Sequence, residues 1–142
     1  MSRSVLEDMK VNIKIKLSAL WAAVTLCYLY GDYFGLYKPG ALQSMLDGQM
    51  GPLGPATQGV LVGTSLLMAV PSVMVFLSLV LTPNINRWMN IVLGVLYTLI
   101  MIVTLRGEWA YYILLGVIEI TLTLLVVAHA WRWPSAVSCA TT

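Results

Sequence analysis

Charged side chains are scarce in this chain of 142 residues, in which Asp, Glu, Lys and Arg together make up 10% of the sequence. A soluble domain of this length needs many more charged residues to cover its solvent-facing surface. The basic residues are also dispersed, and no tract has the density that nucleic-acid binding requires. The composition therefore excludes an ordinary soluble domain and a nucleic-acid-binding protein.

Cysteine and histidine are also nearly absent. Cys27 and Cys139 belong to no CxxC pair, and His129 is the only histidine. Zinc and haem sites need several such ligands at characteristic spacings. Serine-nucleophile elbows, P-loops and dinucleotide fingerprints are missing too. We therefore expect no metal and no cofactor, and no motif indicates an enzyme.

Hydrophobic residues are abundant instead, at 59% of the chain, and the mean hydropathy is +0.85. They form four long runs, at residues 17–37, 57–81, 88–105 and 110–133. Because a helix rises about 1.5 Å per residue, about 20 apolar residues cross the roughly 30 Å core of a bilayer. The sequence thus predicts an all-α fold: a four-helix transmembrane bundle that forms one membrane domain over residues 1–142, with a disordered tail at 134–142.

The basic residues indicate how the bundle is oriented. Six of the eight lie on the N-terminal side of the membrane if there are four spans, and two lie on the other side. The six are Arg3, Lys10, Lys14, Lys16, Arg87 and Arg132, and the two are Lys38 and Arg106. Because cytoplasmic loops carry the excess of Lys and Arg, we expect both termini inside the cell and a multi-pass protein of the plasma or inner membrane. The tryptophans are expected to form an aromatic belt near the span ends: Trp21, Trp88, Trp109, Trp131 and Trp133.

Residues 3–16 predict a short amphipathic helix that lies on the membrane surface before the first span. Ser4 and Glu7 fit a capping box. Apolar residues share one face of this helix, and Lys10 and Lys14 lie on another. The alternative is a disordered basic tail that only sets the orientation.

The second run carries Gly59 and Gly63 at GxxxG spacing and Pro71 near its centre. Small residues at this spacing allow membrane helices to approach closely. Proline lacks a backbone N–H, so it frees a carbonyl and bends the helix. We therefore expect Gly59 and Gly63 to pack against a neighbouring helix and Pro71 to mark a kink.

Two acidic residues interrupt the apolar runs. Glu119 lies near the middle of the last run, and Asp32 lies close to the outer end of the first. A carboxylate at the bilayer centre costs about 2.5–3.5 kcal/mol on insertion scales, so such a residue faces the bundle interior and is a candidate for a functional site. Tyr28 and Tyr112 share the helical faces of Asp32 and Glu119.

These four residues are candidates for a site that handles a proton or a ligand, and we expect Glu119 to be hydrogen-bonded to groups of the first span. The alternative is that the acids are neutral, hydrogen-bonded structural groups.

Several stretches between Lys16 and Trp133 carry a resemblance: KLSALW, YLYGDYFGLYKPG, PSVMVFLSLVL, NRWMNI and the final AWRW. In these stretches the chain resembles an uncharacterised family of small prokaryotic four-span membrane proteins, a domain of unknown function. The most specific parts are Asp32–Gly40 and Asn86-Arg87-Trp88. The resemblance implies a single four-helix bundle and supplies no activity, and the tail after Trp133 is expected to lie outside it.

Together these features predict a small multi-pass membrane protein whose bundle has an acid-bearing polar cavity open toward the outer side. Such a cavity would bind or pass a small solute or a proton. The alternative is a structural or accessory subunit of a larger membrane complex, or a homo-oligomer, with no activity of its own and with GxxxG faces for docking. The two hypotheses differ in whether Asp32 and Glu119 face the inside of one bundle or the contact between chains.

Overall fold

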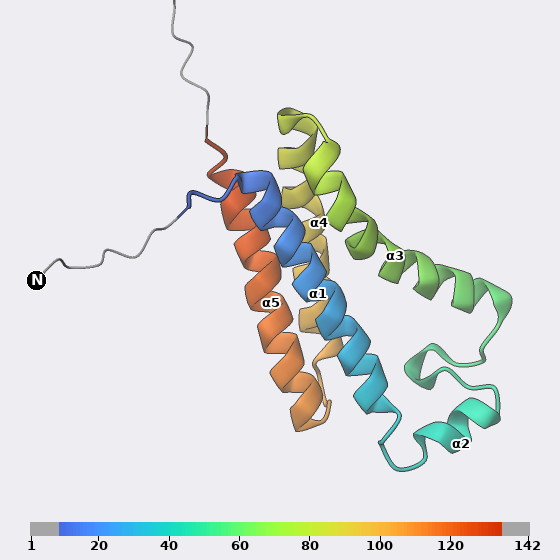
Figure 1. The fold of residues 1–142 in the computed structure, drawn as a ribbon. Helices are drawn as coiled ribbons and strands as arrows, with labels where there is room; N and C mark the ends of the chain where they lie inside the picture. Colours follow the sequence, from blue (N-terminus) through green and yellow to red (C-terminus); the bar gives the residue numbers. More distant parts are fainter. Residues whose placement is uncertain (1–8, 135–142) are drawn as a thin grey trace, which may run out of the picture.

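The computed structural model describes residues 9–134, which form helices joined by turns (Figure 1). The elements are α1 (Ile13–Gly35), α2 (Ala41–Leu46), the 3-10 turn η1 (Gly51–Leu53), α3 (Gln58–Val80), α4 (Pro83–Thr104) and α5 (Ala110–Trp131). Four of them, α1, α3, α4 and α5, are long and apolar enough to cross a membrane. The expected all-α fold with four membrane helices is confirmed.

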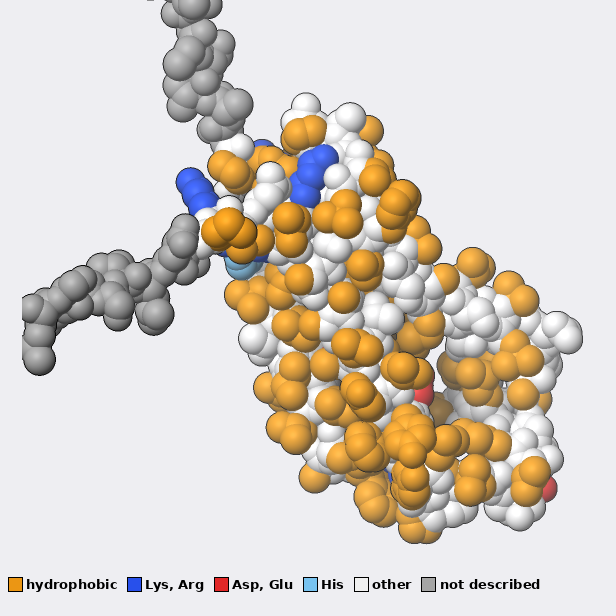
Figure 2. All heavy atoms as spheres, viewed as in Figure 1, with side chains coloured by type: hydrophobic (Ala, Val, Ile, Leu, Met, Phe, Trp, Pro, Cys, Tyr) orange, Lys and Arg blue, Asp and Glu red, His pale blue; other side chains and the backbone are white. Residues whose placement is uncertain are grey.

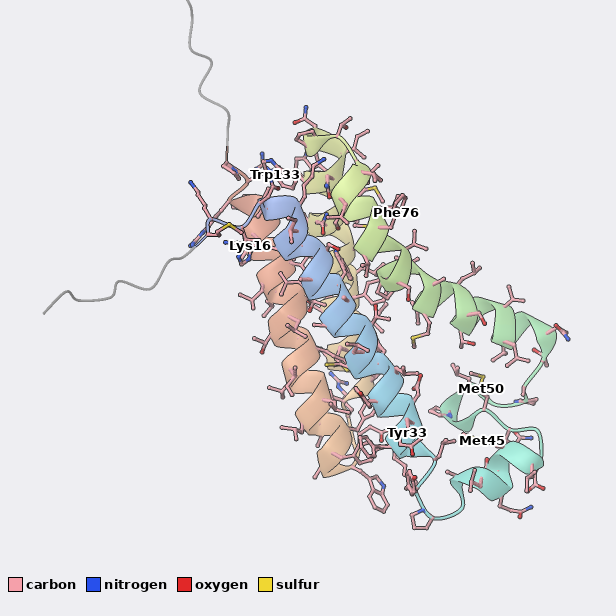
Figure 3. All side chains as sticks on the ribbon, viewed as in Figure 1. Lys16, Tyr33, Met45, Met50, Phe76 and Trp133 are labelled. Atoms are coloured by element: carbon pink, nitrogen blue, oxygen red, sulfur yellow. The ribbon has the colours of Figure 1, made fainter. Side chains whose placement is uncertain are left out.

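The outer surface of the bundle is apolar, as Figure 2 shows for one face. Leu66 and Phe76 on α3 and Leu114 on α5 are each 63% exposed. A protein exposes so many large apolar side chains on its surface when that surface faces lipid tails. Lys and Arg side chains gather at one end of the bundle, where Lys16 and Trp133 lie, and Tyr33 lies toward the other end (Figures 2 and 3). The chain thus has the surface of a multi-pass membrane protein.

Helix α1 lies between two neighbours, α3 and α5, and α5 also packs against α4. Direct packing between α3 and α4 is slight. Figure 1 shows why: α3 bends, and its first half runs away from the other three spans. All four membrane helices therefore pack together only toward the Lys16 end.

Pro71 lies inside α3 and is buried. Because proline has no N–H, the carbonyl of Leu67, four residues earlier, loses its helical hydrogen bond. The hydroxyl of Tyr97 on α4 donates to this carbonyl at 2.5 Å. The free carbonyl expected from the sequence is therefore satisfied by the next helix, and this bond joins α4 to α3 where α3 bends.

Tyr97→Phe is expected to lower the free energy of unfolding by about 1–2 kcal/mol, because the Leu67 carbonyl is then left unpaired. In a Pro71→Ala background the same change is expected to cost about 0.5 kcal/mol or less, because the alanine supplies the missing N–H. Unfolding of the four variants in detergent gives the coupling energy. Equal costs of Tyr97→Phe in both backgrounds would contradict the link between the hydroxyl and the proline.

Gly59 and Gly63 lie in the first half of α3, away from the other helices. A Cβ added at Gly63 would meet no atom within 4 Å, and one at Gly59 would meet only Thr57 of the preceding turn. Within the described chain these two glycines therefore bring no helices together, contrary to the expectation. The bend at Pro71 is the physical reason, because it carries this half of α3 away from α1 and α4.

Close approach depends on two other glycines, one on each of the last two helices. A Cβ at Gly94 of α4 would lie 2.7 Å from Val127 Cγ2 and 3.2 Å from the backbone oxygen of Thr123. A Cβ at Gly116 of α5 would overlap the side chain of Leu105. The small residues that hold the bundle together thus lie between α4 and α5.

A chain of buried side-chain hydrogen bonds joins α1, α4 and α3. Trp21 Nε1 donates to Asn90 Oδ1 at 2.7 Å, and Asn90 Nδ2 donates to Asn86 Oδ1 at 2.6 Å. Asn86 Nδ2 in turn donates to the Ser78 carbonyl at 2.6 Å. Trp21 is fully buried and is therefore not part of an aromatic belt. The expectation was wrong because α1 begins at Ile13, so Trp21 lies two turns inside the helix.

Two other boundaries also differ from the sequence prediction. Helix α4 begins at Pro83 and not at Trp88, because proline fits the first helical position, where its missing N–H is not needed. Asn12 caps α1, since its side chain accepts from the Lys14 amide at 2.9 Å. Residues 9–12 of the expected surface helix are therefore not helical. The Ser4–Glu7 capping box and the tail after residue 134 lie outside the described residues.

Candidate functional site

A cavity of about 90 Å³ lies among α1, α3, α4 and α5. That volume has room for a few water molecules or for one small chemical group. Its lining is mostly apolar and aromatic with two acids: Tyr28, Gly31, Asp32, Leu67, Met68, Tyr97, Ile100, Met101, Thr104, Tyr112, Leu115, Gly116 and Glu119. Apolar walls with a few polar groups are typical of ligand pockets.

All four residues singled out in the sequence line this one cavity. Tyr28 and Asp32 come from α1, one helical turn apart, and Tyr112 and Glu119 come from α5, two turns apart. Their helical spacing places each pair on one face, and α1 packs directly against α5. The two faces therefore meet inside a single bundle.

Glu119 is buried, with 3% of its surface exposed. Its Oε2 atom has no hydrogen-bond partner among the described residues. The carboxyl thus faces the interior as expected, but the expected hydrogen bond to the first span is not formed. A buried carboxyl without a partner is costly, whether it is neutral or ionised. A proton, a water molecule or a ligand in the cavity would offset this cost.

Asp32 is exposed on the surface of the chain and lines the same cavity, so it lies where the cavity opens. Figure 2 shows an acidic side chain in the hollow beside α3. Because the first half of α3 stands apart, this opening lies on the side of the bundle that α3 leaves uncovered (Figure 1). The cavity therefore has one acid at its mouth and one at a buried wall.

Three tyrosine rings form the aromatic part of the wall: Tyr28, Tyr97 and Tyr112. The ring of Tyr97 packs edge-on against Trp21, at 5.9 Å between centroids, and against Tyr28, at 6.1 Å. Tyr97 was not among the site residues predicted from the sequence. Its position could have been found from Pro71, because the carbonyl freed at Leu67 requires a donor from a neighbouring span.

An ion pair lies at the end of the bundle where α1 ends and α5 begins. Its two residues are in the segments that follow α1 and precede α5. Lys38 Nζ is 2.5 Å from Glu108 Oε2. It also lies 5.7 Å from the ring centroids of both Tyr111 and Tyr112. The hydrogen bond to Glu108 raises the pKa of Lys38, so the Lys38 ammonium stays charged at neutral pH. It joins the end of α1 to the start of α5 beside the cavity.

No group of three His, Cys, Asp or Glu side chains that could hold a metal ion occurs within residues 9–134. Over the same part of the chain, the two acids are the only carboxylates that line the cavity. The polar side-chain groups that line the cavity are these two carboxyl groups, three phenolic hydroxyls and the hydroxyl of Thr104.

The model of a family of unknown function, DUF6326, matches residues 5–139. The chain belongs to this family. The resemblance seen in the sequence is thereby confirmed, with a correction to its range: the DUF6326 match begins before Lys16 and continues past Trp133 into the tail. No curated protein and no solved structure matches the chain. Membership in DUF6326 therefore supplies a family but no activity.

Proposed function

We propose that this protein uses the cavity to bind a small solute or a proton and to pass it through part of the membrane. The observation that carries the proposal concerns Glu119. This residue is only 3% exposed, it lines the cavity, and its Oε2 atom has no partner among the described residues. Structural acids in membrane helices are paired with other groups of the bundle. An unpaired carboxyl beside an open cavity is suited to a ligand that binds reversibly.

The mouth of the cavity supports the same function. Asp32 is exposed at the cavity opening, and it lies toward the end of the bundle that carries Lys38 and Glu108. The excess of basic residues at the opposite end favours a cytoplasmic location for that end. We therefore infer that the cavity opens toward the outer side of the membrane, so that a solute reaches Glu119 by way of Asp32.

A second candidate function rests on the first half of α3. Gln58, Gly63, Ser65 and Ala69 are exposed there, and none of the described helices covers Gly63. Small and polar residues on a membrane helix are typical of helix–helix contacts. A docking surface for another chain, in a homo-oligomer or a larger complex, would explain them.

Thiol accessibility tests the cavity function. In a background with Cys27→Ala and Cys139→Ala, Gly31→Cys places a thiol on the cavity wall. A Cβ there makes only ordinary contacts, the nearest 3.8 Å from the Tyr112 ring. Leu29→Cys is the matched control, because Leu29 lies on the same helix within one turn, does not line the cavity and is 61% exposed on the apolar surface.

The thiol at position 31 is expected to react with charged methanethiosulfonate reagents in proteoliposomes at least about ten times faster than the thiol at position 29, because such reagents modify thiols only in contact with water. Labelling is measured by mass spectrometry of the intact protein. If the two thiols react equally slowly, solutes of the size of these reagents do not reach the cavity, and the proposed binding of a solute is wrong.

The docking function makes a separate prediction. Gly59→Leu with Gly63→Leu is expected to lower the oligomeric mass in mild detergent if α3 contacts another chain, because bulky side chains prevent close approach. Light scattering coupled to size exclusion measures the mass. An unchanged mass, together with unchanged labelling at position 31, would reject the docking function and retain the cavity.

A further inference from the structure

We propose that the ligand of the cavity is an organic cation, an amine or a quaternary ammonium group on an apolar body. This inference rests on the proposed function of the cavity and adds the chemical class of its ligand. Four features of the described residues carry it: the charge of the lining, the aromatic wall, the apolar side chains of the lining and the opening beside α3.

The lining that the described residues form has acidic groups and no basic one. Asp32 and Glu119 are its acidic residues, and no Lys, Arg or His belongs to it. Lys38, a cation that lies beside the Tyr112 ring of this wall, is already held by Glu108 at 2.5 Å. The buried Oε2 of Glu119 has no partner there that would offset a negative charge. A positively charged ligand would offset the cost of these uncompensated carboxyl groups, whereas an anion would be repelled.

The tyrosine rings favour a cation that has lost its water. Rings attract cations within about 6 Å of their centroids, and sites for quaternary ammonium groups are built from several such rings. Tyr28, Tyr97 and Tyr112 together surround the cavity. The Tyr112 ring already has one cation near it, since Lys38 Nζ lies 5.7 Å from its centroid. The same wall can accept an ammonium group from the cavity side.

The apolar part of the lining argues against an inorganic cation. Ca²⁺ takes about six to eight oxygen ligands and Mg²⁺ keeps most of its water. Leu67, Met68, Ile100, Met101 and Leu115 form much of the wall instead. Such side chains desolvate methyl and methylene groups favourably, at about 25 cal/mol per Å² of apolar surface. The ligand therefore carries carbon around or beside its charge.

The opening beside α3 provides room for the rest of the ligand. The cavity of about 90 Å³ holds a head group of a few heavy atoms. The first half of α3 stands apart from the bundle (Figures 1 and 2), so an apolar body can extend from the head group toward the lipid on that side. Leu67 and Met68 of α3 lie at this boundary and belong to the lining. The site thus takes an amphipathic cation with its charge toward Asp32 and Glu119.

Charge selectivity at Gly31→Cys tests this inference. The thiol is treated with the trimethylammonium-bearing or the sulfonate-bearing methanethiosulfonate, and each rate is divided by the rate of the same reagent with free 2-mercaptoethanol. We expect the normalised rate to be at least about tenfold higher for the cation, which corresponds to about 1.4 kcal/mol. Asp32→Asn is expected to reduce the ratio several-fold. Asp47→Asn is the matched control, because it removes the same charge from the exposed connector, and it is expected to leave the ratio unchanged.

Protection by a free ligand completes the test. Millimolar benzyltrimethylammonium is expected to slow labelling of Gly31→Cys at least about threefold, and benzenesulfonate is expected to have no effect. If both reagents label the thiol equally and the ammonium gives no protection, the cavity function stands and the organic cation is wrong. If neither reagent labels the thiol faster than the one at Leu29→Cys, the cavity function itself is wrong, and this inference is wrong with it.

Discussion

Asn90→Ala is expected to lower the free energy of unfolding by about 2–4 kcal/mol. Asn90 is fully buried on α4, accepts from Trp21 Nε1 at 2.7 Å and donates to Asn86. Removing its amide leaves the indole N–H of Trp21 and the Oδ1 atom of Asn86 without their partner. Each buried polar group left unpaired costs about 1–3 kcal/mol, and hydrogen bonds between membrane helices contribute about 1–2 kcal/mol in model peptides. The loss is large because this side chain joins α1 to Asn86 of α4, whose own amide donates to the Ser78 carbonyl of α3.

Asn84→Ala is the control for this prediction, since Asn84 lies on the same helix and is exposed. It is expected to change stability by less than about 0.5 kcal/mol. Thermal or denaturant unfolding in detergent, followed by circular dichroism, measures both. If Asn90→Ala is as stable as Asn84→Ala, the buried chain of hydrogen bonds does not hold α1, α4 and α3 together.

Gly94→Leu is expected to destabilise the bundle by about 3 kcal/mol or more, at the top of the range for overpacking. Even a single added carbon at this position would lie 2.7 Å from Val127 Cγ2 and 3.2 Å from the Thr123 backbone oxygen. The side chain of Val127 can turn away, but the backbone of α5 cannot, so leucine forces α4 and α5 apart. Helix propensity favours leucine over glycine by about 0.5–1 kcal/mol, which is too little to compensate.

Gly63→Leu is the matched control, because a Cβ at Gly63 meets no atom within 4 Å. In the monomeric protein it is expected to have no destabilising effect, and the gain in helix propensity even favours a small stabilisation. Unfolding of both variants under the same detergent conditions makes the comparison. A larger loss at Gly63 than at Gly94 would mean that α3, and not the α4–α5 pair, makes the close helix contact.

Composition was sufficient to predict the four membrane helices, because an apolar run of the right length has few alternatives in a chain with so little charge. The ends of helices were harder to predict. Pro83 lies between the apolar runs at 57–81 and 88–105, although proline is well suited to the first residue of a helix and begins α4. Trp21 was assigned to the interface because the start of α1 was placed too late.

Helical periodicity was sufficient to predict which residues of the site share a helix face. Tyr28 and Asp32 share a face, as do Tyr112 and Glu119, and the cost of exposing acids to lipid requires both faces to turn inward. The periodicity of one helix does not reveal how helices bend. The kink at Pro71 could be predicted, but its direction could not. The bend leaves Gly59 and Gly63 without a neighbour among the described helices, and it opens the cavity beside Asp32.

A density map of the protein in lipid nanodiscs would test most directly whether the acid-bearing cavity holds a bound solute. We expect non-protein density in contact with the Glu119 carboxyl, enclosed by Tyr28, Tyr97 and Tyr112 and reaching the opening at Asp32. A map in which these side chains close on one another, and Glu119 is hydrogen-bonded within the protein with no space beside it, would contradict the account.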